Sequence, residues 1–149
     1  MNLWRISNHK TLDGGGGLVA SARWHTRGHP VVYLAESPAG ALVETLVHLE
    51  LDLDHLPWHY QLLKVEAPDS LAVQAVESTA LRSGWTNDEL ITRALGDKWL
   101  KSGETALLRV PSAIVPDSWN MLLNPMHPEA NRVKVLWHRA HPWDKRLFR

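Results

Sequence analysis

The chain of 149 residues contains no cysteine. This absence excludes disulfide bonds, thiolate metal ligands and a cysteine nucleophile together. Aromatic residues other than tryptophan are also scarce, with one phenylalanine and two tyrosines beside eight tryptophans. A buried indole needs a hydrogen-bond partner for its N–H. We therefore expect the tryptophans to divide between the core and a binding surface.

Net charge and long apolar runs are lacking as well. Sixteen lysines and arginines balance 16 aspartates and glutamates. The chain therefore has no net positive charge that would indicate binding to nucleic acid or to an anionic membrane. No segment approaches the roughly 18 apolar residues of a membrane span, and the first ten residues lack the apolar stretch of a signal peptide. The sequence predicts a soluble cytoplasmic protein with one domain over residues 1–149.

The motifs of common metal and phosphate sites are absent too. The nine histidines include no HExxH pair, and those spaced four residues apart lack a nearby third ligand. The four successive glycines 14–17 fit neither of the glycine patterns that cradle phosphates. Glycines have no side chains to pack, so residues 12–17 are predicted to form a loop. We predict no metal site and no bound cofactor.

The elements that can be read from the pattern indicate the α+β class, with strands outnumbering helices and no βαβ rhythm. One helix should begin at Ser37-Pro38, an N-cap followed by a proline at the first helical position, and run to about His48. Another should follow the T-x-x-E capping box at residues 86–89 and end near Lys101. The strands are expected at residues 3–6, 30–35, 60–67, 105–110, 119–123 and 132–137.

The first of these helices carries a polar pair opposite its apolar face. At ~100° per residue, Leu42 and Leu46 share one side, and Glu44 and His48 lie one turn apart on the other. The apolar stripe must face the core, so the pair faces either solvent or a cleft. Helical geometry alone does not decide between the two.

Five ordered segments resemble the RES-domain family of bacterial toxins over nearly the whole chain. They are WR near the start, RWHTRGHPVVYLAESPAGALVETLVH, ALLRVPSAIVP, LLNPMHPEA and the closing DKRLF. The resemblance implies a fold similar to ADP-ribosyltransferase toxins, with central β-sheets flanked by helices. It also implies degradation of NAD+ by hydrolysis or phosphorolysis, which arrests growth, and a partner antitoxin with an Xre-type helix-turn-helix part that blocks the pocket.

The resemblance also implies site residues, position by position. The family's arginines fall on Arg5 and Arg23, its tyrosine on Tyr33, its glutamate on Glu44, its serine on Ser112 and the asparagine of its LNPxHP motif on Asn124. Trp24 and His48, the neighbours of Arg23 and Glu44, join them as substrate-binding candidates. Where the family commonly shows Gly-Gly-Arg-Trp-Asn, this chain has Ser21, Ala22 and His25 around Arg23 and Trp24.

The chemistry of NAD+ cleavage suits these residue types. Breaking the nicotinamide–ribose bond passes through an oxocarbenium-like sugar, which a carboxylate stabilises, and Glu44 is the candidate. A guanidinium is a bidentate partner for a pyrophosphate, a task for Arg5 and Arg23. Tyr33 could stack on nicotinamide or bind the ribose, and Ser112 could hydrogen-bond a ribose or phosphate oxygen.

Several alternatives stay open at this point. Inorganic phosphate could be a co-substrate, and the ADP-ribose could instead be transferred to a protein. The chain could also be a catalytically idle module that only binds its antitoxin. A homodimer within the toxin–antitoxin complex is compatible with the sequence, and any contact with DNA is expected from the antitoxin rather than from this uncharged chain.

Overall fold

The computed structural model describes residues 1–49 and 54–148. Within them, seven strands form a single mixed sheet in the order β4-β5-β6-β2-β1-β3-β7. The strands are β1 (Asn2–Ser7), β2 (Val32–Ala35), β3 (Gln61–Glu66), β4 (Val73–Ala75), β5 (Leu107–Pro111), β6 (Trp119–Leu123) and β7 (Lys134–Ala140). The helices are α1 (Gly15–Val19), α2 (Pro38–His48) and α3 (Glu89–Ser102), with short 3-10 turns at Ser78–Ala80, Trp85–Asn87, Ala130–Arg132 and Lys145–Phe148. The predicted α+β class is confirmed.

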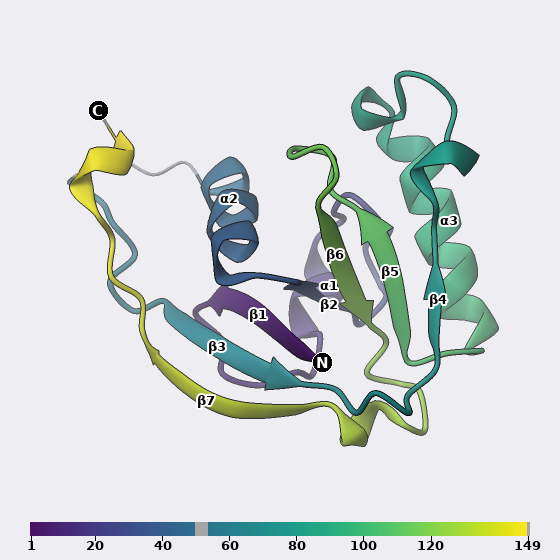
Figure 1. Ribbon diagram of the computed structural model, residues 1–149, viewed down its shortest axis with the longest axis horizontal. Coiled ribbons are helices and arrows are strands. Elements are labelled where there is room, and N and C mark those ends of the chain that lie inside the picture. Colours follow the sequence, from purple (N-terminus) through teal and green to yellow (C-terminus); the bar gives the residue numbers. More distant parts are fainter. Residues whose placement is uncertain (50–53, 149) are drawn as a thin grey trace.

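The sheet changes direction between β1 and β2. These two strands are joined through one residue pair, Trp4 with Ala35, whereas β1 and β3 are paired along their whole lengths. Figure 1 shows β1, β3 and β7 crossing the direction of β6, β5 and β4, with α2 above β1 and α3 beside β4 and β5. The two halves therefore diverge beneath α2.

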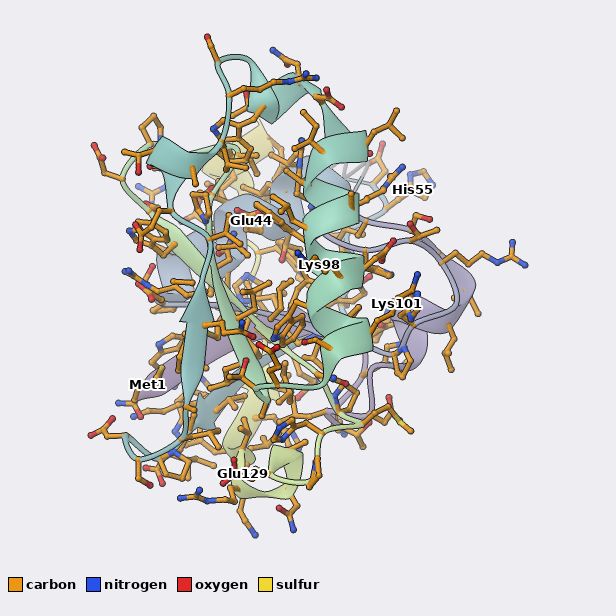
Figure 2. The ribbon with its side chains drawn as sticks, turned by 90° about the vertical axis from the view of Figure 1, so that its right-hand side faces the viewer. Met1, Glu44, His55, Lys98, Lys101 and Glu129 are labelled. Carbon is orange, nitrogen blue, oxygen red and sulfur yellow. The ribbon has the colours of Figure 1, made fainter. Side chains whose placement is uncertain are left out.

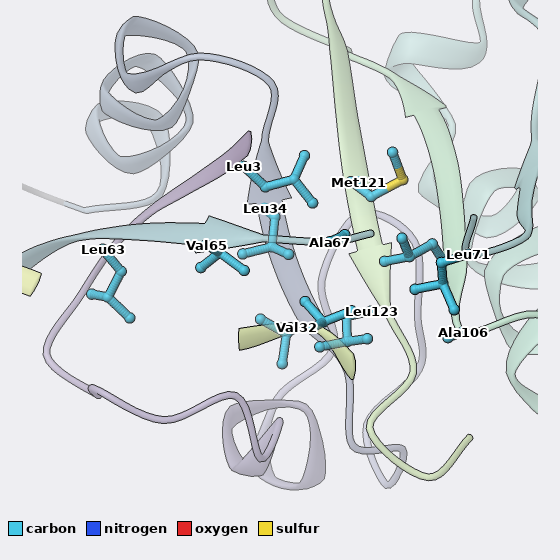
Figure 3. Close-up of a cluster of buried hydrophobic side chains, with 12 residues drawn as sticks. Leu3, Val32, Leu34, Leu63, Val65, Ala67, Leu71, Ala106, Met121 and Leu123 are labelled. Atoms are coloured by element: carbon cyan, nitrogen blue, oxygen red, sulfur yellow. The ribbon is translucent and has the colours of Figure 1, made fainter. Parts of the chain in front are cut away.

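The core of the sheet is a cluster of aliphatic side chains contributed by both halves. Leu3, Leu63 and Val65 from one half meet Val32, Leu34, Met121 and Leu123 from the other, all nearly inaccessible to solvent (Figure 3). Burying one side chain of this size stabilises the fold by about 1.5–3 kcal/mol. The cluster fixes the two halves relative to each other and so fixes the region where they diverge.

Helix α2 begins as predicted. Ser37 is the N-cap, its hydroxyl accepts a hydrogen bond from the Gly40 N–H at 2.9 Å, and Pro38 occupies the first helical position. Leu42 and Leu46 pack against a second apolar cluster around Ile6, Leu62 and Trp143. The orientation of α2 is therefore set by local capping and by its apolar stripe.

Helix α3 ends at Gly103 in the left-handed conformation, in agreement with its glycine-terminated pattern, but its start differs from the prediction. Thr86 does not cap it, because residues 85–87 form a separate 3-10 turn. The N-cap is Asp88, whose carboxylate accepts a hydrogen bond from the Ile91 N–H. Asp88 lies one residue before Glu89, the acid of the predicted capping box. Its side chain can satisfy the backbone N–H groups of the first helical turn, which have no partner within the helix.

Two other elements differ from the sequence-based expectation. Residues 15–19 form the helical turn α1 instead of a loop. In this turn Gly17 lies so close to the 29–31 backbone that a Cβ would fall 2.2 Å from the His29 carbonyl oxygen, so only glycine fits there. Strand β4 was not predicted at all. It has three residues, of which Val73 and Ala75 are exposed, and it is held by parallel pairing to β5.

No helix among residues 1–49 and 54–148 is long and apolar enough to cross a membrane.

Candidate active site

Two cavities lie on either side of one carboxylate. The first, of about 270 Å³, is lined by β1, β2 and α2, and its lining includes Arg5, Tyr33, Glu44 and His48. The second, of about 240 Å³, lies between α2 and the β5–β6 connection and includes Ser112. Glu44 and Asn120 line both cavities. The predicted Glu44 and His48 pair therefore faces a cleft, and Figure 2 shows Glu44 to the left of α3.

One oxygen of Glu44 is fixed by two donors. Oε1 accepts hydrogen bonds from Ser112 Oγ at 3.0 Å and from Asn120 Nδ2 at 2.7 Å. The Ser112 oxygen itself accepts from the backbone N–H groups of Ile114 and Val115, both at 3.1 Å. Since a hydroxyl has two acceptor lone pairs and one proton, that proton is directed to Glu44.

The other oxygen of Glu44 is held less tightly. Oε2 lies 3.9 Å from His48 Nε2, beyond hydrogen-bond distance. The Glu44 side chain is 26% exposed and that of His48 is 61% exposed. Glu44 is thus a carboxylate with one oxygen saturated by the protein and the other available to a ligand.

Asn120 was not predicted as a site residue. It reaches Glu44 because β6 pairs with β2, which brings it within reach of α2. Its signal in the sequence is an amide within the otherwise apolar strand at residues 119–123, a position where a buried polar group needs a partner. Which partner it takes depends on the sheet order, and no local pattern gives that.

Arg5 reaches the first cavity from β1. Burial lowers the pKa of its guanidinium, and the carboxylate of Asp13 opposes this shift. An arginine side chain remains protonated in proteins, so Arg5 brings a half-buried positive charge to the cavity wall. Its Nη1 donates to the Thr11 carbonyl oxygen at 3.4 Å, a long contact that leaves its other donors available.

The ring of Tyr33 lines the first cavity, but its hydroxyl is held by the loop before β2. The Tyr33 oxygen accepts from the Trp24 N–H at 3.0 Å and lies 2.8 Å from His25 Nδ1. His25 Nε2 is 2.8 Å from the Ala20 carbonyl oxygen, so it must donate there. Nδ1 of neutral His25 therefore accepts the Tyr33 proton.

Burial has consistent effects on both groups. It lowers the pKa of His25 and raises the pKa of Tyr33, so both are neutral near pH 7. Tyr33 accordingly offers the cavity an aromatic face, while its proton is committed to His25. Where the family commonly has asparagine, His25 is a buried positioning residue, and the neighbouring Ala22 lines the first cavity.

Three predicted site residues lie away from both cavities. Arg23 donates from Nη1 to the Thr86 carbonyl oxygen at 2.9 Å, and its Nη2 is 3.9 Å from Glu89, so it links its loop to the start of α3. Trp24 is 2% exposed and packs in an apolar cluster with Val31 and Trp99. Asn124 is also buried, and its side-chain oxygen accepts from the Met126 N–H in a turn.

Among the residues that the structure describes, no group of three or more histidine, aspartate or glutamate side chains is placed to hold a metal ion. The polar groups around Glu44 are the hydroxyl and the amide that hold it, the half-buried guanidinium of Arg5 and the imidazole of His48, and the second cavity adds the carboxylates of Glu36 and Asp117. This set can bind an anionic ligand at one end and stabilise a cation at the other.

A model of the RES domain family matches residues 2–144. The chain is 47% identical over 148 residues to Toxin Res of Pseudomonas putida, covering 99% of this chain and all of that protein. It is 35% identical over 158 residues to the Prs ADP-ribosylating toxin of a Sphingobium species, covering 99% and 97% of the two chains. The chain therefore belongs to the RES domain family and is a RES-domain toxin.

The fold has a solved counterpart. In the crystal structure of the M. tuberculosis MbcT–MbcA toxin–antitoxin complex, a chain superposes with a TM-score of 0.74 at 16% identity, covering 99% of this chain and 86% of that one. At this identity the likeness concerns the fold.

Proposed function

We propose that this toxin consumes NAD+ by cleaving the bond between nicotinamide and ribose at the first cavity. The observation that carries the proposal is the state of Glu44. Its Oε1 is saturated by Ser112 and Asn120, and its Oε2 is left for a ligand at the junction of the two cavities. A preorganised carboxylate of this kind stabilises positive charge that develops in a transition state.

The proposed reaction needs little else from the protein. As the glycosidic bond breaks, its electron pair moves onto the pyridinium ring and nicotinamide leaves as a neutral molecule. No general acid is needed, which suits a Tyr33 whose proton is committed to His25. The positive charge moves to the ribose, where Glu44 Oε2 stabilises it. Arg5 supplies a positive charge for the pyrophosphate.

The second cavity favours water as the acceptor. Three carboxylates line it, those of Glu36, Glu44 and Asp117, and of these Glu36 is paired with Arg109. Its excess negative charge disfavours inorganic phosphate. Water adding to the ribose carbon would give ADP-ribose and release one proton. We therefore favour hydrolysis over phosphorolysis.

A second candidate is transfer of ADP-ribose to a protein. The Sphingobium relative, named an ADP-ribosylating toxin, supports it. The two reactions share the cleavage step at Glu44 and differ in what occupies the second cavity, whose negative charge would also attract a cationic side chain.

We further propose that the chain acts in the cytoplasm together with an antitoxin that covers the cavities. The structural counterpart from M. tuberculosis is a toxin–antitoxin complex. We expect an Xre-type antitoxin, which would supply any DNA contact because this chain has a net charge of zero.

The test is product analysis by NMR after incubation with NAD+, with and without phosphate and with cell extract. We expect nicotinamide and ADP-ribose in equal amounts, independent of phosphate. A phosphate-dependent ADP-ribose phosphate would show phosphorolysis, and labelled extract protein would show transfer. Unchanged NAD+ in every arm would overturn the proposal and leave an antitoxin-binding module.

A further inference from the structure

The first cavity cannot enclose a whole dinucleotide. Its volume of about 270 Å³ is below the ~300–1,000 Å³ typical of pockets that bury drug-sized ligands, and NAD+ is larger than most of those ligands. If the nicotinamide riboside half lies against Glu44, as the proposed function requires, the ADP half must lie outside the cavity.

A row of alternating indoles and cations continues from the wall of this cavity. Trp4, which lines the cavity, is paired with Lys64 of β3, and Lys64 is paired with Trp137 of β7. Directly paired residues point to the same side of a sheet, and Figure 1 shows β1, β3 and β7 side by side. The row lies on the face that carries Ile6 and Leu62, which α2 covers in part.

The cations of this row are held over aromatic faces. The Lys64 ammonium is 5.5 Å from the centroid of Trp4, and the Arg139 guanidinium is 4.8 Å from that of Trp137. The two indoles are 5.8 Å apart in an edge-to-face arrangement. Within residues 1–49 and 54–148 neither cation forms an ion pair, so both positive charges are available to an anion. Indole faces also accept the flat face of a nucleobase.

Charge distinguishes this row from the other side of the cavity. The second cavity presents Glu44 and Asp117 beside the ion pair of Glu36 with Arg109, and the carboxylates of Glu44 and Asp117 repel a pyrophosphate. The row beyond Trp4 presents Lys64 and Arg139 instead. An anionic ADP group leaving the first cavity is therefore drawn toward β3 and β7.

We propose that Trp4, Lys64, Trp137 and Arg139 (the tryptophan–cation row) form the subsite for the ADP half of the dinucleotide. Lys64 and Arg139 bind the phosphate on the adenosine side of the pyrophosphate, the phosphate on the nicotinamide side stays with Arg5, and an indole of the row stacks on adenine. The subsite determines specificity, because it selects the dinucleotide over nicotinamide ribosides that lack the adenylate. This inference rests on the proposed function for the orientation of NAD+, while the predicted affinity for ADP can be measured without any turnover.

The experiment compares NAD+ with nicotinamide mononucleotide, which has the same scissile bond but no adenylate. In the double variant Lys64→Gln and Arg139→Gln, we expect KM for NAD+ to rise about tenfold, the size of losing a charge-assisted contact of ~1.4 kcal/mol. Turnover of nicotinamide mononucleotide should stay at the wild-type rate. Lys98→Gln is the matched control, since Lys98 lies exposed on α3, which lines neither cavity (Figure 2).

Binding of ADP, followed by quenching of tryptophan fluorescence, is a second readout. We expect quenching in the wild type and in Lys98→Gln, with about tenfold weaker affinity in the double variant. A folded double variant with wild-type KM for NAD+ and wild-type affinity for ADP would overturn the subsite. A wild type that binds ADP but cleaves neither nucleotide would contradict the proposed function and leave the subsite standing.

Discussion

Helices α2 and α3 pack against the same sheet, yet their polar residues do different work. On α3, Thr92 donates to the Arg23 carbonyl oxygen, Arg93 to that of Ala22, and Asp97 accepts two hydrogen bonds from Thr26. These contacts attach residues 22–26 to the helix. On α2, Glu44 is held by two side chains and keeps one oxygen at a cavity.

The difference distinguishes charged residues that stabilise the fold from charged residues that are available to a ligand. Arg23 and Arg5 are the same residue type and were expected to do the same task, but Arg23 is engaged by the α3 side and Arg5 reaches the cavity. A polar group whose contacts lie away from both cavities, as those of Arg23 do, stabilises the fold. A polar group that lines a cavity and has hydrogen-bonding capacity left over, as Arg5 and Glu44 have, is placed for a ligand.

The largest expected effect is that of Glu44→Gln. The substitution keeps the shape and removes the negative charge, so NAD+ turnover should fall about 10²-fold to 10³-fold while the melting temperature changes little. Cells expressing the variant without antitoxin should keep their NAD+. Glu89→Gln is the matched control on α3, and it should leave kcat unchanged. Equal losses in the two variants, or none in either, would break the distinction between the helices.

Gly96→Ala should act on stability instead. A Cβ at Gly96 would lie 1.6 Å from the Trp24 carbonyl oxygen, so α3 and the attached loop would have to separate. We expect a loss of about 3 kcal/mol in the free energy of unfolding, the upper part of the range for overpacking. Gly16→Ala on α1 is the control, because nothing lies within 4 Å of its added methyl group. Urea denaturation of both variants measures the difference, and equal midpoints would contradict the close packing.

Local patterns predicted α2, its Ser37 cap and most strands because each depends on residues a few positions apart. They missed β4, which is only three residues long and is held by its pairing to β5, and the turn α1, in which Gly17 contacts the backbone twelve residues later. For the site, the sequence predicted Glu44 and Ser112, which prove to be in contact. The sequence did not predict that Arg23 and Trp24 lie away from the cavities. Both residues belong to a loop that packs against α3, and only the tertiary structure shows this packing.

The two helix caps offer a smaller and more specific comparison. Ser37→Ala removes the acceptor for the Gly40 N–H and should cost about 1 kcal/mol of stability. It should also lower kcat moderately, because α2 carries Glu44. Asp88→Ala removes the cap of α3 and should lower the melting temperature without changing kcat. Calorimetry and initial rates on both variants test this, and a loss of kcat in Asp88→Ala would show that α3 also positions the site.

The smallest effect concerns a buried polar group on the α2 side. Both ring nitrogens of His141 are buried and have no hydrogen-bond partner among the described residues, and the ring packs edge-to-face on Trp143 at 4.5 Å. The buried polar groups on the α3 side are paired, such as Thr92 with Arg23 and Trp99 with Thr105. The α2 side therefore carries a pH-sensitive group that can be removed without breaking a hydrogen bond of its side chain.

Burial lowers the pKa of His141 in the folded state, whereas the unfolded chain has the ordinary value of about 6.5. As the pH falls, the unfolded state therefore binds the proton first. The contribution of neutral His141 to the free energy of unfolding is complete above about pH 6.5 and is lost as the pH falls through the folded-state pKa. His141→Phe should keep the contact with Trp143 and reduce the fall in melting temperature between pH 7.5 and pH 5.5. Part of the fall should remain, because burial also lowers the pKa of His25. If the phenylalanine ring were too large for the site, the variant would have a lower melting temperature than the wild type by the same amount at both pH values. An unchanged difference between the two pH values would show that His141 is not the titrating group.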